Sequence, residues 1–174
     1  FIMMHGDATD GIPNGEHMTE YSRRLFEEPD QLKEESRQRV ANALARAERM
    51  KQHGGLDGYA LCSDYCFNSG PFLRPAMFAE FVTPFLKELI AWYRRLGFYT
   101  IKHTDGNIMP ILNDLLDARQ HALHSLDPQG GVDMAEMARA AGERVCLIGN
   151  VNCGLLDTGT EEQCAESARY ALRH

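Results

Sequence analysis

The sequence contains no apolar run near the roughly 20 residues that a membrane-spanning helix needs. It also has no excess of positive charge, because 18 lysines and arginines stand against 25 aspartates and glutamates, a formal net charge of −7. A nucleic-acid-binding protein usually carries a basic face, and this composition argues against that class. We therefore expect neither a membrane nor a nucleic acid among the partners of the protein.

Cysteines are few, and they form no recognisable framework. There are five of them, Cys62, Cys66, Cys146, Cys153 and Cys164. The odd number and the spacing fit neither a zinc finger nor a small disulfide scaffold. Reduced thiols in a cytoplasmic protein are the simplest interpretation. We expect Cys62 to point into the core, and Cys153 to be the thiol that faces a site unless it is a buried, unreactive one.

No Gly-x-Gly-x-x-Gly motif opens a helix, which argues against a nucleotide-binding open sheet. What the sequence does contain is an alternation of short apolar runs with helical patterns. The apolar runs cover residues 1–4, 58–62, 98–102, 122–126 and 145–149, and the helical patterns cover residues 29–52, 76–96, 108–116, 133–141 and 161–172. Such alternation predicts parallel strands joined by helical crossovers.

The predicted fold class is α/β, a partial (β/α)8 TIM barrel with about five strands of the parallel barrel present. A complete barrel of this kind needs about 250 residues, and this chain has 174. The first residues already resemble a strand, and the last ones lie within a helical pattern. We therefore expect a single barrel domain over residues 1–174 that is truncated at both ends.

Polar side chains follow each of the five apolar runs. Barrel enzymes take their catalytic residues from the carboxyl ends of several strands, so these side chains are expected to face one shared mouth. In chain order they are His5 and Asp7; Ser63, Asp64 and Tyr65; His103, Asp105 and Asn107; His124 and Asp127; and Asn150, Asn152 and Cys153.

The densest of these turns is residues 102–107, and its His103 and Asp105 allow three interpretations. As acid–base groups, they need only a substrate within hydrogen-bond reach. As metal ligands, they need a third donor from another strand, for which Cys153, Asp64 and His124 are the candidates. In the third interpretation both are structural, with Asp105 capping the following helix and His103 bonding a backbone carbonyl.

Several short motifs occur in an order that resembles a known family. They are Ser63-Asp64-Tyr65, Gly70-Pro71-Phe72-Leu73-Arg74-Pro75, Phe81-Val82-x-Pro84, Lys102-His103-Thr104-Asp105-Gly106-Asn107, Asp127-Pro128-x-x-Gly131-x-Asp133, and Gly149-Asn150-Val151-x-Cys153-x-Leu155-Leu156-x-x-Gly159-Thr160. Their order and spacing resemble the central segment of the uroporphyrinogen decarboxylase superfamily. The resemblance covers nearly all of the chain from about residue 57 onward, and it implies a (β/α)8 barrel with its pocket at the carboxyl ends of the strands.

The activity that we expect first from this resemblance is cofactor-independent decarboxylation of a tetrapyrrole polycarboxylate, a carboxy-lyase reaction on a small-molecule substrate. Asp64, His103 and Asp105 are then the predicted catalytic residues. The predicted substrate-binding residues are Tyr65, Arg74, Asn107, His124, Asp127, Asn150 and Asn152. Of these, Arg74 is suited to bidentate binding of a carboxylate, although an exposed surface arginine fits the same position. The decarboxylases usually carry a serine where Arg74 stands.

The resemblance implies two alternatives. The related methyltransferases use zinc and a corrinoid protein, and their zinc motif His-x-Cys reads His103-x-Asp105 here. In that case His103, Asp105 and Cys153 are the predicted zinc ligands, and an aspartate makes the site harder than a thiolate would. The third interpretation is a non-catalytic barrel that binds a tetrapyrrole or a corrinoid. A homodimer is compatible with all three.

Overall fold

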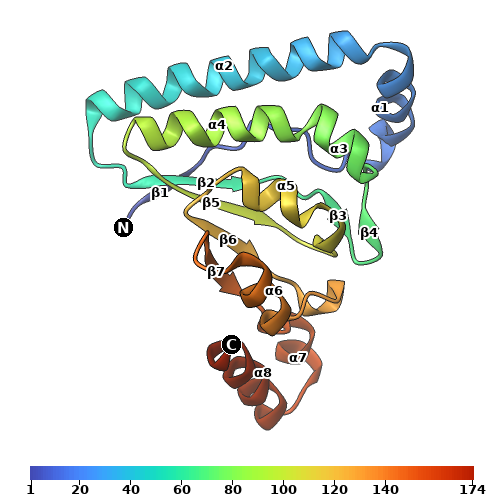
Figure 1. The fold of residues 1–174 in the computed structure, drawn as a ribbon, viewed down its shortest axis with the longest axis vertical. Helices are drawn as coiled ribbons and strands as arrows, with labels where there is room; N and C mark the ends of the chain where they lie inside the picture. Colours follow the sequence, from blue (N-terminus) through green and yellow to red (C-terminus); the bar gives the residue numbers. More distant parts are fainter.

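The structure is a computed structural model of residues 1–174, and its centre is a five-stranded parallel sheet. The strands are β1 (Met3–His5), β2 (Gly58–Cys62), β5 (Tyr99–Thr104), β6 (Ala122–Ser125) and β7 (Cys146–Gly149). They lie in the order β1-β2-β5-β6-β7, which is also their order in the chain, and every neighbouring pair is parallel (Figure 1). This arrangement confirms the predicted α/β class and the partial barrel of about five strands.

Helices cover one face of this sheet. The helices of the chain are α1 (Gly15–Glu27), α2 (Pro29–His53), α3 (Pro75–Phe81), α4 (Thr83–Arg95), α5 (Leu112–Asp117), α6 (Met134–Ala141), α7 (Cys153–Thr158) and α8 (Glu161–Arg173). The long helices α2 and α4 lie side by side above the sheet, while α7 and α8 lie at the far end of the molecule, beyond β7 (Figure 1). No helix is both long enough and apolar enough to cross a lipid bilayer.

Two short 3-10 turns and a hairpin complete the fold. The turns are Met109–Ile111 and Pro128–Gly130, and the hairpin pairs β3 (Cys66–Phe67) with β4 (Gly70–Pro71) in antiparallel register. The hairpin follows β2 directly, so it lies at the carboxyl end of the sheet, where the predicted polar residues also gather.

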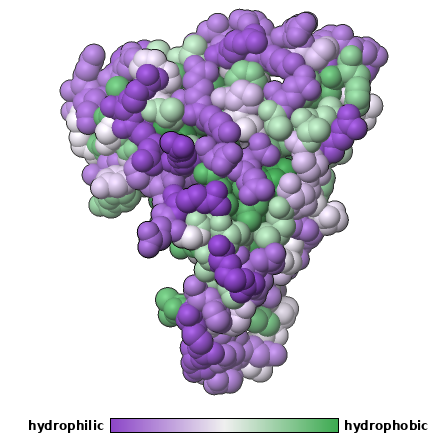
Figure 2. Space-filling model, in the orientation of Figure 1, coloured by the Kyte–Doolittle hydropathy of each residue, from purple (hydrophilic) through white to green (hydrophobic).

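The two faces of the sheet differ in burial. On β5, Thr100, Lys102 and Thr104 are buried, whereas the alternate residues Ile101 and His103 are only half-buried. Successive strand residues point to opposite faces, so the helix-covered face is the core and the other face is open. Figure 2 shows a largely hydrophilic surface over α2, with hydrophobic residues gathering toward the middle of the molecule.

The helical pattern over residues 76–96 forms two helices rather than one. The break falls at Val82, between α3 and α4, where the backbone leaves helical geometry at φ −120°. Pro84 explains the break, because a proline has no N–H to continue the helical ladder and its ring clashes with the preceding turn. Helix α1 was not predicted. Its apolar residues Met18, Tyr21 and Leu25 recur at helical spacing, but most of the helix is polar and only Leu25 is buried.

Replacing Thr160 with alanine is expected to lower the free energy of unfolding by about 1 kcal/mol. The Thr160 hydroxyl accepts a hydrogen bond from the Gln163 N–H, and the Gln163 side chain accepts one from the Thr160 N–H at 2.8 Å. Together they form the predicted capping box of α8. Urea denaturation measures the change. Thr160→Ser keeps the hydroxyl and should remain near the wild type, and an equal loss in both variants would contradict the capping role.

Candidate metal centre

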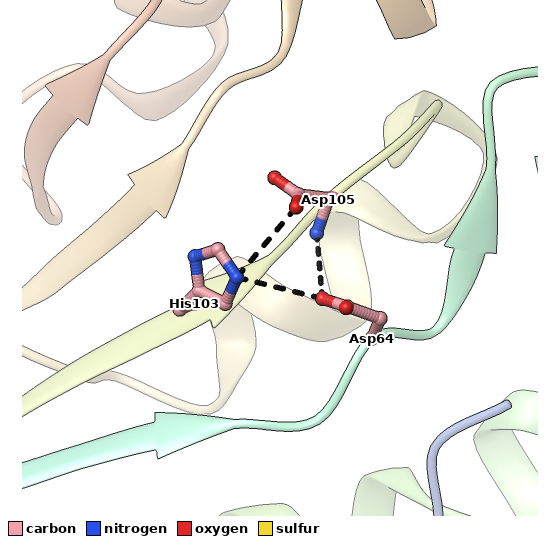
Figure 3. Close-up of side chains that lie close together, drawn as sticks. All are labelled: Asp64, His103 and Asp105. Carbon is pink, nitrogen blue, oxygen red and sulfur yellow. Dashed lines mark hydrogen bonds and ion pairs between the residues drawn. The ribbon is translucent and has the colours of Figure 1, made fainter.

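Three predicted catalytic residues come together where β2 and β5 end. Asp64 follows β2, His103 is the penultimate residue of β5, and Asp105 follows β5. One ligand atom of each lies within 4.8 Å of the others. Nε2 of His103 is 3.6 Å from Oδ1 of Asp64 and 3.8 Å from Oδ2 of Asp105 (Figure 3). The three side chains therefore converge on one small space.

This geometry suits a divalent cation better than a set of direct hydrogen bonds. Distances of 3.6 and 3.8 Å exceed the range of an N–H···O hydrogen bond. Nitrogen and oxygen ligands bind zinc at about 2.0–2.2 Å, which puts two ligands of a tetrahedral ion about 3.4 Å apart. The observed separations are only slightly longer. About half of each carboxylate side chain is exposed, so a cation can enter from solvent.

Backbone contacts fix the two carboxylates relative to one another. The Asp105 N–H donates to Oδ1 of Asp64 at 3.0 Å, which ties the end of β5 to the end of β2. The next residue, Gly106, has φ +79° and lies against the hairpin, where a Cβ atom would come within 2.6 Å of the Cys66 carbonyl oxygen. The Asn107 N–H then donates to the Phe67 carbonyl at 3.0 Å. The turn that carries Asp105 is thus seated on the β3–β4 hairpin.

A buried ion pair lies beneath this site. The Lys102 side chain is fully buried, and its Nζ donates to Oδ2 of Asp7 at 2.8 Å, to the Ser63 carbonyl at 2.9 Å and to the Leu61 carbonyl at 3.3 Å. Asp7 also accepts from the Ser63 N–H at 3.0 Å. The pair therefore holds both backbone groups of Ser63, the residue directly before Asp64.

The two buried groups respond differently to their surroundings. Burial lowers the pKa of Lys102, and the Asp7 charge opposes this shift. Burial raises the pKa of Asp7, but the Lys102 charge and the hydrogen bonds from Lys102 and Thr9 outweigh burial and hold that pKa below its ordinary value. Sequence analysis gave no role to Lys102. The available signal was a lysine that continues an apolar strand, where a charge needs a buried partner.

A second imidazole touches His103 from the neighbouring strand. His103 and His124 are register partners on β5 and β6, and their Nδ1 atoms are 2.8 Å apart. Burial lowers the pKa of His124, and the nearby His103 lowers it further. His124 was predicted to contact substrate or to supply a third metal donor. In the structure Asp64, and not His124, belongs to the cluster with His103 and Asp105. His124 contacts Nδ1 of His103, the ring nitrogen that does not face the two aspartates.

Two of the residues predicted to bind substrate are buried in the protein interior. The Tyr65 hydroxyl is hydrogen-bonded to the Thr9 hydroxyl at 2.6 Å, and Nζ of Lys102 lies over its ring. Nδ2 of Asn150 donates to the carbonyls of Leu126 and Val132, both at 2.7 Å. Only 3% of Tyr65 and 5% of Asn150 is exposed, so the Tyr65 hydroxyl and Nδ2 of Asn150 are bonded within the protein.

Three other predicted substrate-binding residues accept a hydrogen bond from the backbone two residues further along the chain. Oδ1 of Asn107 accepts from the Met109 N–H, Oδ1 of Asp127 accepts from the Gln129 N–H, and Oδ1 of Asn152 accepts from the Gly154 N–H at the start of α7. Their polarity is explained by these hydrogen bonds, since Asn and Asp favour such positions. Arg74 is exposed directly before α3 and makes no ion pair.

The cysteines also depart from expectation. Cys153 is exposed at the start of α7, and the ligand cluster contains Asp64 in place of it. Of the predicted zinc ligands, His103 and Asp105 thus lie together with Asp64, and Cys153 lies outside this cluster. Cys62 is exposed rather than in the core, because it lies at the end of β2, opposite His103 in the register of the sheet.

Comparisons with known proteins agree with this fold. The family model described as Uroporphyrinogen decarboxylase (URO-D) matches residues 14–174. A solved methyltransferase from Methanosarcina mazei superimposes with a TM-score of 0.75 and 22% sequence identity, over 89% of this chain and 44% of that one. An S-adenosylmethionine:tRNA ribosyltransferase-isomerase from Caulobacter sp. (strain K31) is 29% identical over 99 residues, which is 56% of this chain and 26% of that protein.

The chain thus spans about a quarter of the curated relative and less than half of the solved methyltransferase. At 22% identity the structural likeness shows the fold alone.

Proposed function

This chain belongs to the uroporphyrinogen decarboxylase family, and from that premise we propose that it acts as a divalent-cation-dependent methyltransferase with a corrinoid protein as its partner. The observation that carries the proposal is the convergence of Asp64, His103 and Asp105, one imidazole and two carboxylates, within 4.8 Å. Asp105 stands where the zinc motif of the related methyltransferases has a cysteine, its carboxylate can serve as a ligand in place of the thiolate, and Asp64 completes the set.

The cation would be held by Nε2 of His103 and by one oxygen from each carboxylate. This set is harder than the family's thiolate-containing one, and it accommodates zinc, cobalt or manganese. When bound, such an ion supplies Lewis acidity, which lowers the pKa of a coordinated acceptor thiol. The residues of this chain orient the ion at the mouth of the sheet and leave its outer side accessible to substrate, because both aspartates are half-exposed.

Decarboxylation of a tetrapyrrole polycarboxylate is the second candidate, and the match to the family model favours it. Without a cation, however, Asp64 and Asp105 present negative charge at the point where a polycarboxylate would have to bind. Like charges at close range repel, and His103 is the only side chain of the cluster that is not a carboxylate. The charge of the site therefore favours the cation-dependent reaction.

Cation binding is the first test. A calorimetric titration of the protein with zinc or cobalt is expected to show that one ion binds per chain. Each of Asp64→Asn, His103→Gln and Asp105→Asn should weaken the cation affinity by at least about 100-fold. Losing a residue that only hydrogen-bonds to a metal ligand already lowers metal affinity about 10–100-fold, and losing a ligand itself should cost more. Asp157→Asn, which changes an exposed aspartate outside the cluster, is the matched control and should bind as the wild type does.

The reaction is then distinguished by its product. Methyl transfer from a methylated corrinoid to a thiol, lost on chelation and restored by the ion, supports the proposal. Release of carbon dioxide from a tetrapyrrole by protein that binds no cation would replace it with decarboxylation. Tight corrinoid or tetrapyrrole binding with neither product would point to the non-catalytic interpretation.

A further inference from the structure

The contact between His103 and His124 limits where their protons can be. Their Nδ1 atoms are 2.8 Å apart, which is a hydrogen-bond distance. Two bare nitrogens at this distance would repel through their lone pairs, and two N–H groups would clash. One of the two Nδ1 atoms must therefore carry the proton, and the other must accept it.

The choice of donor decides what His103 presents to the two aspartates. A neutral imidazole has one N–H and one bare nitrogen. If His103 donates through Nδ1, its Nε2 is bare and can bind a cation between Asp64 and Asp105. If His124 donates instead, Nε2 of neutral His103 carries the proton and cannot be a ligand. Only the first arrangement is compatible with the cation site.

The sheet keeps the two rings in contact. β5 and β6 are inner strands, and each is hydrogen-bonded to a neighbour on both sides. His103 and His124 stand opposite one another in the register, and their ring centroids are 5.0 Å apart. Since both backbones are fixed by the ladder, the ring of His103 has little freedom to turn away while its Nδ1 is bonded.

We propose that His124 is a positioning residue, which accepts the Nδ1–H of His103 and so aims the bare Nε2 at the position between Asp64 and Asp105. This inference rests on the proposed cation-dependent function and deepens it. His124 acts through His103 and does not itself touch the ion. Partners of this kind fix the tautomer and the orientation of metal-binding histidines, and they raise ligand basicity.

Two substitutions of the same residue test the proposal in the full chain. His124→Asn places an amide oxygen near the position of Nδ1 and keeps an acceptor, whereas His124→Leu removes it. Cobalt affinity, measured by calorimetry and by the visible absorption of the bound ion, is expected to fall about 10–100-fold in His124→Leu. His124→Asn should recover most of that loss. His5→Leu, on the edge strand β1 and outside the cluster, is the control and should leave the affinity unchanged.

The outcomes separate this inference from the proposed function. Absence of cobalt binding in the wild type would overturn the proposed function and, with it, the role of His124 toward a cation. Wild-type affinity in His124→Leu would overturn the inference alone. Equal losses in His124→Asn and His124→Leu would also overturn it, because an acceptor at position 124 would then make no contribution to the affinity.

A second measurement covers the case in which His124→Leu fails to fold. Imidazole nitrogen NMR of the zinc-loaded wild type reports which nitrogens of His103 carry protons. A protonated Nδ1 and a zinc-bound Nε2 are expected on His103, with Nδ1 of His124 bare. Zinc on Nδ1 of His103, or a proton on Nδ1 of His124, would overturn the proposal without any variant.

Discussion

Replacing Lys102 with methionine is expected to lower the free energy of unfolding by about 3–5 kcal/mol, the usual loss when one partner of a buried ion pair is removed. The substitution leaves the Asp7 carboxylate buried without its counter-charge. It also removes the donor to the carbonyls of Leu61 and Ser63. Chemical denaturation measures the change. Lys87→Met, which removes a solvent-exposed ion pair with Asp117, should stay within about 0.5 kcal/mol of the wild type.

The pH dependence of this loss tests its cause. In the wild type the pKa of Asp7 is held below its ordinary value of 3.8, so its contribution to stability is present above pH 3.8 and is lost as the pH falls below it. In the variant, burial without Lys102 raises the pKa of Asp7. Acid then protonates the carboxyl and relieves the penalty. The difference in stability between the two proteins should therefore shrink toward low pH, and a constant difference would contradict the ion-pair explanation.

Replacing Gly106 with alanine is expected to destabilise the protein by at least about 2 kcal/mol, and to weaken cation binding as well. The residue has φ +79°, a region that L side chains rarely adopt. An added Cβ would also come within 2.6–2.8 Å of backbone atoms of Cys66 and Phe67. The turn must then move off the hairpin, and Asp105 moves with it.

The matched control is Gly55→Ala. Gly55 has φ +81°, nearly the same backbone conformation, but an added Cβ there would meet nothing within 4 Å. Its loss should be limited to backbone strain, about 1 kcal/mol, with cation affinity unchanged. Denaturation and cobalt titration on both variants separate strain from displacement. Equal effects of the two substitutions would show that contact with the hairpin does not position Asp105.

The strands were predictable from sequence because each is a short apolar run ended by a polar turn. All five predicted runs contain or overlap a strand of the sheet. Helix α8 was equally visible, because its capping box is a local signal that needs no tertiary contact. Helix α1 has no such cap, because the Asn14 side chain makes no capping hydrogen bond. Most residues of α1 are polar, and its position depends on packing against α2.

The candidate site was predictable only in part. His103 and Asp105 are two residues apart in one turn, so their proximity follows from the chain itself. Asp64 lies on a different strand, and a single sequence gives no measure of distance between strand ends. Asp64, Cys153 and His124 were thus all candidates for the third donor, and the family resemblance alone favoured Cys153. Tyr65 and Asn150 show a second limit of the sequence, because polar residues at strand ends can hydrogen-bond inward as readily as they face a ligand.

The order of the sheet has a consequence for synthesis on the ribosome. Strand order follows chain order, so each strand leaving the exit tunnel finds the edge of its predecessor already made. Asp7 is the exception, because its counter-ion Lys102 lies 95 residues further along the chain. A lone carboxylate is too costly to desolvate, so the nascent chain must leave Asp7 hydrated until β5 has been made. The first two strands can reach their final packing only after the third has emerged.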